Sequence, residues 1–101
     1  MTKEENRFQQ AVRRLGCIAC RLDGHPGTPA EIHHLLSGGR RRGEMHVLGL
    51  CAAHHRGGYR DGQFVSRHPY RARFEAKFGS EEVLLKKTRE LVAALDQRRA
   101  A

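Results

Sequence analysis

The sequence contains no tryptophan, and aromatic residues make up only 6% of its 101 positions. Hydrophobic residues account for 39% of the chain. A chain this short buries too little apolar surface for two cores, so we expect a single domain that spans residues 1–101. Its core should be modest, and small domains of this kind are often stabilised by a structural metal ion.

Cysteine is also scarce. The three cysteines are too few, and odd in number, for a disulfide framework. The chain has neither the apolar segment of a signal peptide nor eighteen consecutive apolar residues, so we expect no membrane partner. In the reducing cytoplasm cysteines commonly bind metal ions, and we predict that role for them here.

Acidic residues are fewer than basic residues. Lys and Arg exceed Asp and Glu by 19 to 11, which gives a formal net charge of +8 and a pI near 10.3. Fifteen of the basic residues are arginine, whose guanidinium group can bind phosphate oxygens through two hydrogen bonds. This balance favours a polyanionic partner, most simply nucleic acid.

Three segments repeat apolar residues at the spacing of an amphipathic helix. In the second segment Tyr70, Phe74 and Phe78 recur every four residues after Pro69, and we expect this stripe to face the core. Ser80, followed by two glutamates, predicts the N-cap of the third helix. The three predicted helices span residues 3–15, 69–78 and 81–98.

The middle of the chain is predicted to be less regular. Residues 16–30 are rich in Gly and Pro and predict turns. Residues 30–36 and 45–50 favour two strands, joined by an exposed, mobile, basic loop with the sequence SGGRRRGE. A short helix is expected at 52–57, directly after the second strand.

Two short motifs could supply the ligands of a metal ion. Cys17 and Cys20 form a CxxC motif, and Cys51 and His54 form a CxxH motif after 30 intervening residues. Together they provide the ligand set of a closed tetrahedral zinc site. A redox role for the CxxC motif is disfavoured, because no βαβ pattern surrounds it and the second motif would have no explanation. We therefore predict a structural Zn²⁺ ion.

Four further histidines, His33, His34, His46 and His55, lie in the same part of the chain. Strand alternation places His33 and His34 on opposite faces, and neighbours on a helix diverge by about 100°. His54 can therefore face the zinc motif while His55 faces the hairpin, where it can meet one histidine of the doublet. Histidines beside an arginine-rich loop suit phosphodiester hydrolysis, which needs a base, a divalent cation and a positive surface.

The motifs CIAC, IHH, SGG, MHVLGLC and CAAHH, in this order, resemble those of the HNH endonucleases, also called ββα-metal or His-Me finger nucleases. The match covers about residues 15–57, with His46 five positions before Cys51 and His55 directly after the CxxH motif. The resemblance implies an α+β fold, with a zinc-stapled ββα-metal core, an N-terminal helix and two C-terminal helices. It also implies metal-dependent hydrolysis of DNA phosphodiester bonds.

The resemblance assigns roles to the four histidines. His34 would be the general base that activates water, and His46 would orient this base or brace the hairpin. His33, where the family usually has Asp, and His55 would hold a catalytic divalent ion. Mg²⁺ or Mn²⁺ is expected, although neutral imidazole suits Mn²⁺, Ni²⁺ or Zn²⁺ better than Mg²⁺.

The C-terminal segment RARFEAKFGSEEVLLKKT extends the resemblance. With it, about residues 14–96 are similar to the phage recombination enhancement (Ref) family, described as RecA-dependent nucleases. This similarity implies an endonuclease that acts on DNA paired within a RecA filament, in phage recombination or repair. It implies a location in the cytoplasm of a bacterial host or phage-infected cell.

Five arginines flank the predicted catalytic groove and are the preferred phosphate contacts. They are Arg40, Arg41, Arg42, Arg56 and Arg60. Two histidines fall outside the motif: His25 is expected in a solvated loop, and His68 where a link ends before a helix. The alternative function is a non-catalytic zinc-stabilised module that binds DNA or a recombinase through the same surface. Such a module needs the cysteines and arginines, whereas only a nuclease needs His34.

Overall fold

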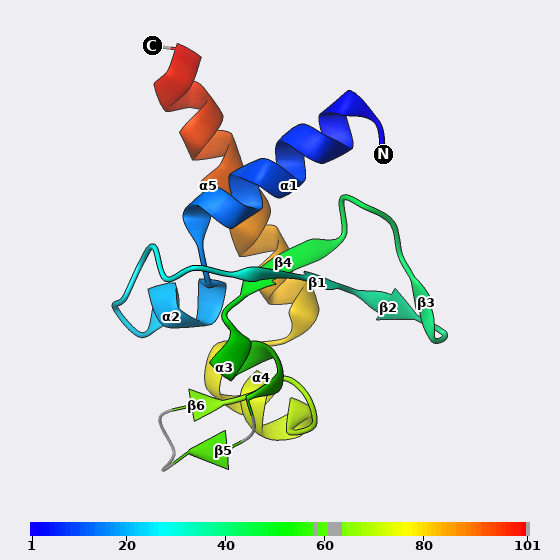
Figure 1. Cartoon of the computed structure of the whole chain (residues 1–101), viewed down its shortest axis with the longest axis vertical. Helices are drawn as coiled ribbons and strands as arrows, with labels where there is room; N and C mark the ends of the chain where they lie inside the picture. Colours follow the sequence, from blue (N-terminus) through cyan, green and yellow to red (C-terminus); the bar gives the residue numbers. More distant parts are fainter. Residues whose placement is uncertain (58, 61–63, 101) are drawn as a thin grey trace.

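The computed structural model describes residues 1–57, 59–60 and 64–100, which form a small α+β domain. A hairpin made of β1 and β4 crosses the middle of the molecule, with α1 and α5 crossing on one side and α3 and α4 on the other (Figure 1). In chain order the elements are α1 (Lys3–Leu15), α2 (Ile18–Leu22), β1 (Glu31–His34), β2 (Leu36–Ser37), β3 (Arg40–Arg41), β4 (Val47–Leu50), α3 (Ala52–Arg56), β5 (Tyr59–Arg60), β6 (Phe64–Val65), α4 (Arg71–Phe78) and α5 (Glu81–Ala100).

The central hairpin carries the histidine doublet. Strands β1 and β4 pair antiparallel, with His33 opposite Leu48 and His34 opposite Val47. All of β4 is buried, whereas each residue of β1 is half-buried. Both strands are shorter than the predicted 30–36 and 45–50, and a turn at 44–45 precedes β4.

The basic loop between these strands contains a short ladder that we did not predict. Strand β2 pairs antiparallel with β3, and the turn between them is formed by Gly38 and Gly39. Both glycines have positive φ, 59° and 78°, which two-residue hairpin turns require and which residues with a side chain rarely adopt. The segment is exposed, as expected.

Helix α1 begins and ends where the sequence predicts. Thr2 and Glu5 form a capping box, in which each side chain accepts a hydrogen bond from the other residue's backbone N–H. Phe8, Val12 and neighbouring apolar residues face inward. The helix ends at Gly16, whose φ of 80° again excludes most side chains.

The two C-terminal helices differ from prediction at their ends. Helix α4 begins at Arg71 rather than at residue 69, because the preceding segment is held against α3: the N–H groups of residues 67 and 68 donate to the carbonyls of residues 54 and 55. Tyr70 is 38% exposed, so only Phe74 and Phe78 of the predicted stripe belong to the core. Ser80 caps α5 as predicted, with its Oγ accepting from the N–H of residue 83 at 3.2 Å.

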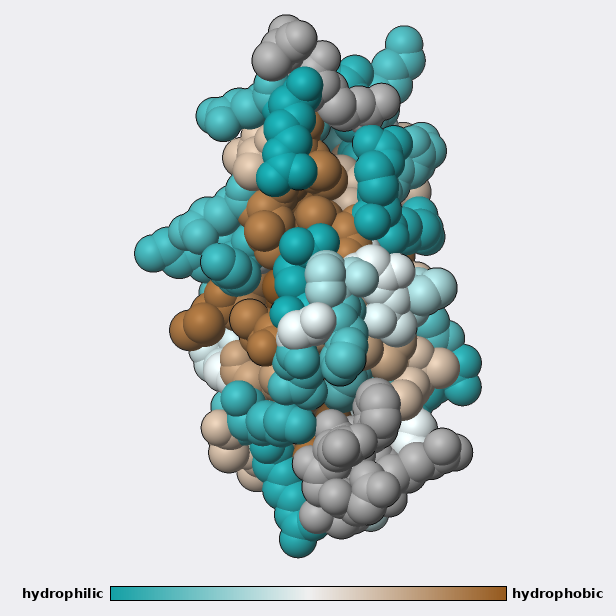
Figure 2. All heavy atoms as spheres, turned by 90° about the vertical axis from the view of Figure 1, so that its left-hand side faces the viewer, coloured by the Kyte–Doolittle hydropathy of each residue, from teal (hydrophilic) through white to brown (hydrophobic). Residues whose placement is uncertain are grey.

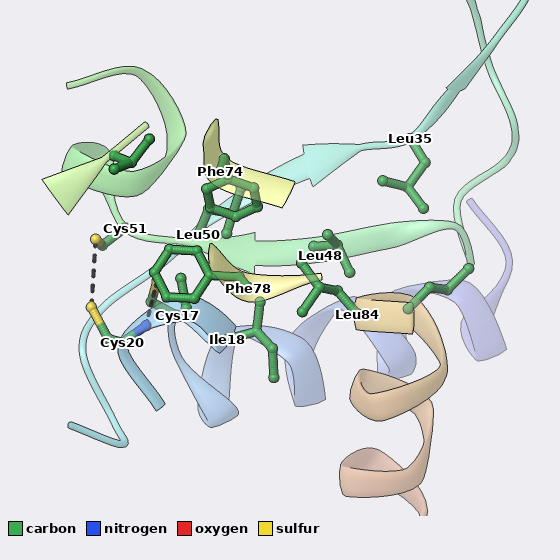
Figure 3. Close-up of a cluster of buried hydrophobic side chains, with 13 residues drawn as sticks. Cys17, Ile18, Cys20, Leu35, Leu48, Leu50, Cys51, Phe74, Phe78 and Leu84 are labelled. Atoms are coloured by element: carbon green, nitrogen blue, oxygen red, sulfur yellow. Dashed lines mark hydrogen bonds between the residues drawn. The ribbon is translucent and has the colours of Figure 1, made fainter. Parts of the chain in front are cut away.

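Two apolar clusters form the core. One lies between α1, β4 and α5. The other surrounds the cysteines, where Ile18, Leu48, Phe74 and Phe78 pack together (Figure 3). Hydrophilic side chains cover much of the face shown in Figure 2, around an apolar strip in its upper half. Among the described residues, none of the helices combines the length and apolar character needed to cross a membrane.

Candidate functional site

The three cysteines and one histidine converge on a single point. The Sγ atoms of Cys17, Cys20 and Cys51 and a ring nitrogen of His54 all lie within 4.8 Å of one another, and all four residues are buried. The two motifs are built alike, because Cys17 is the N-cap of α2 and Cys51 is the N-cap of α3. One helical turn later the chain returns Cys20 and His54 to the same side. Within residues 16–30, which we expected to be rich in turns, the structure adds the short helix α2.

The spacing of these atoms fits a tetrahedral zinc site. Zn–S and Zn–N bonds of about 2.3 and 2.0 Å at tetrahedral angles place two sulfurs about 3.8 Å apart and a sulfur and a nitrogen about 3.5 Å apart. Cys20 Sγ lies 3.7 Å from Cys51 Sγ. His54 Nδ1 lies 3.5 Å from Cys17 Sγ, 3.4 Å from Cys20 Sγ and 3.2 Å from Cys51 Sγ. The cluster therefore fits the predicted structural zinc site.

Burial shifts the pKa values of the cluster toward the neutral forms of its side chains. It raises the pKa of Cys17 to about 12 and raises the pKa of Cys20, because a buried thiolate without a nearby cation is poorly solvated. Burial also lowers the pKa of His54, so its ring stays neutral and keeps a lone pair for a metal. Binding of zinc to this cluster would therefore release protons from the thiols. The His54 ring meets Phe78 edge-on at a centroid distance of 5.3 Å, which ties the cluster to α4.

The next residue of α3, His55, faces the hairpin and meets His33. His33 Nδ1 lies 3.2 Å from His55 Nε2, and the two rings are T-shaped with centroids 5.0 Å apart. The outer nitrogen of each ring bonds a carboxylate: His33 Nε2 lies 2.8 Å from Glu81, and His55 Nδ1 lies 3.1 Å from Glu31. The structure thus brings together the two histidines predicted to hold the catalytic ion.

Glu81 is the first residue of α5 and is 8% exposed. Its carboxylate accepts hydrogen bonds from Arg67 Nε at 2.9 Å and from Arg71 Nη2 at 3.4 Å, besides its bond to His33. The bonds from His33 and Arg67 outweigh burial and hold the pKa of Glu81 down at about 2. Glu81 is therefore ionised at neutral pH, although it is almost fully enclosed.

His34 faces different neighbours from His33, as strand alternation predicts. Its Nε2 lies 3.2 Å from a carboxylate oxygen of Glu44. Gln9 of α1 donates its side-chain amide to the same oxygen at 2.8 Å and to the Glu44 backbone carbonyl at 2.9 Å. The bonds from Gln9 and His34 lower the pKa of Glu44. A charged carboxylate therefore stands beside the predicted general base.

His46 contacts the hairpin through its backbone. Its carbonyl accepts from the N–H of Leu35 at 2.9 Å, and its N–H donates to the carbonyl of Gly43 at 3.1 Å. Burial lowers the pKa of its ring, and its Nδ1 has no hydrogen-bond partner among the described residues. These contacts place His46 next to the chain that follows His34.

The predicted phosphate contacts fall into two groups. Arg40 and Arg41 are exposed on β3, where neither forms an ion pair with the described residues. Arg42 and Arg56 have carboxylate partners: Arg42 pairs with Glu82, and Arg56 donates two hydrogen bonds to Glu31, at 3.2 and 2.7 Å. The side chain of Arg60 lies outside the described residues.

The acidic partners of the histidines were not predicted from the sequence. Glu31 could have been found, because it lies two residues before His33 and so on the same face of a strand. Glu44 lies in the loop between β3 and β4, and no sequence pattern indicated a role for it. Glu81 was explained as an acidic residue in the first turn of a helix, and its partner His33 is 48 residues away.

The chain resembles a known protein family over most of its length. A family model described as "Recombination enhancement, RecA-dependent nuclease" matches residues 1–93. The matched region includes the cysteine cluster, the His33–His55 pair and Glu81. A search of curated proteins finds no match to the chain.

Proposed function

We propose that this chain, which belongs to the recombination enhancement, RecA-dependent nuclease family, is an HNH endonuclease that hydrolyses DNA phosphodiester bonds with the help of a divalent ion. The order of β1, β4 and α3 supports this assignment, because a strand pair followed at once by a short helix is what the ββα motif requires. The cysteine cluster stands apart from the reaction and would hold the zinc that fastens α2 to α3.

The observation that carries the proposal is the gap between His33 Nδ1 and His55 Nε2. Two nitrogens that each lie about 2.1 Å from one ion are about 3.0 Å apart at a right angle and about 3.4 Å apart at a tetrahedral angle. The observed separation of 3.2 Å lies between these values. A divalent ion held there would neutralise charge on the scissile phosphate and on the departing 3′ oxygen.

His34 is proposed as the general base. Its Nε2 faces the Glu44 carboxylate, which can only accept, so this nitrogen carries the hydrogen and Nδ1 keeps the lone pair. Nδ1 would remove a proton from a water molecule, whose oxygen then attacks phosphorus in line with the leaving 3′ oxygen. Gln9 fixes Glu44, and His46 would hold the hairpin in shape through its backbone bonds.

DNA is the proposed substrate, and a RecA filament the proposed partner. The net charge of +8 favours binding to a polyanion. Arg40 and Arg41 form no ion pair with the described residues and are available to bind phosphates. Arg42 and Arg56 would exchange their ion pairs with Glu82 and Glu31 for contacts with phosphate. The family description supports action on DNA in the presence of RecA during recombination.

A cleavage assay tests the proposal. Supercoiled plasmid, and separately a displacement loop assembled by RecA, are incubated with the zinc-loaded protein and Mg²⁺ or Mn²⁺. We expect cleavage by the wild type and a loss of about 10²–10⁴-fold in rate for His34→Ala, the range typical for removal of a general base. His25→Ala serves as the matched control, because His25 is exposed and outside both clusters.

The zinc content and the far-UV circular dichroism of each variant are measured alongside. Loss of cleavage in His34→Ala with zinc and fold retained supports the mechanism. Cleavage of naked plasmid at the same rate as the displacement loop would show that RecA is not needed. If the wild type cuts neither substrate with any divalent ion, the chain is a zinc-stabilised binding module instead.

A further inference from the structure

The His33–His55 pair is flanked on its outer side by two carboxylates from different parts of the chain. Glu31 lies on β1, two residues before His33, and Glu81 begins α5. Both are hydrogen-bonded to a ring nitrogen that points away from the gap between the histidines, at 3.1 and 2.8 Å. The carboxylates are therefore placed to act through the histidines and not in the gap itself.

These two bonds determine which nitrogens carry hydrogen. An ionised carboxylate only accepts hydrogen bonds, so when both rings are neutral His33 Nε2 and His55 Nδ1 are the nitrogens that carry hydrogen. His33 Nδ1 and His55 Nε2 then both present lone pairs to each other across 3.2 Å. Two facing lone pairs repel unless a cation, either a proton or a metal ion, lies between them. The carboxylates thus set both rings in the tautomer that a metal ligand needs.

Glu81 is the better anchored of the two carboxylates. Its side chain is 10% exposed against 38% for Glu31, and it is held on its other side by Arg67 and Arg71. Its position at the start of α5 also places it where a helix favours negative charge. The contacts with Arg67 and Arg71 hold the Glu81 carboxylate at a fixed distance and orientation from the His33 ring.

We propose that Glu81 is a positioning residue that orients His33 as a ligand, so that the first turn of α5 sets the affinity of the divalent-ion site. The inference deepens the proposed function and rests on it, because it presumes that His33 and His55 bind an ion. It predicts that the C-terminal helix, far from the motif in sequence, contributes to metal binding as well as to the core.

The experiment measures Mn²⁺ binding to the full-length, zinc-loaded protein by calorimetry in the absence of DNA. For Glu81→Ala we expect Mn²⁺ affinity to fall by about 10–100-fold, the range seen when an outer partner of a ligand is removed. Glu81→Gln keeps an oxygen that can accept from His33 and should show an intermediate loss. Glu75→Ala is the matched control, because Glu75 bonds the same Arg71 at 2.8 Å without touching His33.

A second readout separates positioning from a general loss of structure. Long-range ¹H–¹⁵N spectra of the imidazoles report which nitrogen of His33 carries hydrogen, and we expect a single Nε2–H form in the wild type and a mixture in Glu81→Ala. A wild type that binds one Mn²⁺ with an affinity unchanged in Glu81→Ala overturns the positioning role alone. A wild type that binds no Mn²⁺ beyond its zinc overturns the ion site of the proposed function as well.

Discussion

Replacing His54 with alanine removes one of four ligands from the cysteine cluster and should destabilise the whole domain. The cluster joins two segments, and Cys20 and Cys51 are 31 positions apart. A cross-link that closes a loop of about 30 residues restricts the unfolded chain by an amount worth about 3.5 kcal/mol. The edge-on contact of His54 with Phe78 adds roughly 1 kcal/mol. We therefore expect a loss of about 4 kcal/mol and a Tm lower by about 15–30 °C.

His55→Ala is the matched comparison, because it changes the neighbouring residue of the same helix. His55 is half-buried, bonds Glu31 and faces His33, outside the cysteine cluster. Removing this partly exposed hydrogen bond to Glu31 should lower the free energy of unfolding by only about 1 kcal/mol. Thermal denaturation followed by circular dichroism gives the stabilities, and mass spectrometry gives the zinc per chain.

The two variants should also differ in activity. His55→Ala should keep one zinc per chain and lose cleavage, whereas His54→Ala should lose zinc and much of its structure. A His54→Ala variant that retains one zinc and melts within about 5 °C of the wild type would refute the loop-closure reasoning. Equal losses of stability in both variants would show that the adjacent histidines do not serve separate clusters.

Three further predictions follow from single positions. Gly16→Ala should cost more than about 1 kcal/mol in chemical denaturation, because φ is 80° and the new Cβ would lie 2.5 Å from the Thr28 carbonyl oxygen; unchanged stability would contradict this. The pKa of Glu81 is about 2 in the folded chain, against an ordinary value of 4.5. Its contribution to the free energy of unfolding is therefore fully present above pH 4.5 and is lost as the pH falls toward 2. In urea titrations over that pH range, the free energy of unfolding of the wild type should fall by up to about 3 kcal/mol more than that of Glu81→Gln. Equal losses in the two proteins would contradict the role of the ionised carboxylate. Arg40→Ala and Arg41→Ala should each lower the salt dependence of DNA binding by about one unit of slope, measured by fluorescence anisotropy, and unchanged slopes would exclude them as phosphate contacts.

Local patterns were sufficient for much of the fold. The apolar stripe predicted α1 with its observed bounds, and Ser80 predicted the start of α5. These predictions succeeded because helix boundaries depend on residues within one turn of each other. The short ladders β2–β3 and β5–β6 and the five-residue α2 were not predicted, because elements of two to five residues carry little periodicity.

The cysteine cluster was predictable for a related reason. A metal site restricts both the type of residue and its spacing, so the CxxC and CxxH motifs identified Cys17, Cys20, Cys51 and His54 as a set. The different directions of His54 and His55 also followed from the helical period. The sequence could not say which histidine of the doublet meets His55, because strand alternation leaves both faces open until the strand is packed.

The sequence by itself determined the three longer helices, the candidate zinc ligands and the positive charge, since each depends on residue type and on local spacing. Only the tertiary structure decided that His33 faces His55, that His34 faces Glu44, and that Arg56 is held by Glu31. Above all, it placed the Glu81 carboxylate on His33 across 48 positions of chain. Such a pair forms only when helix α5 packs against the hairpin, and packing of that kind depends on the shape of the whole core.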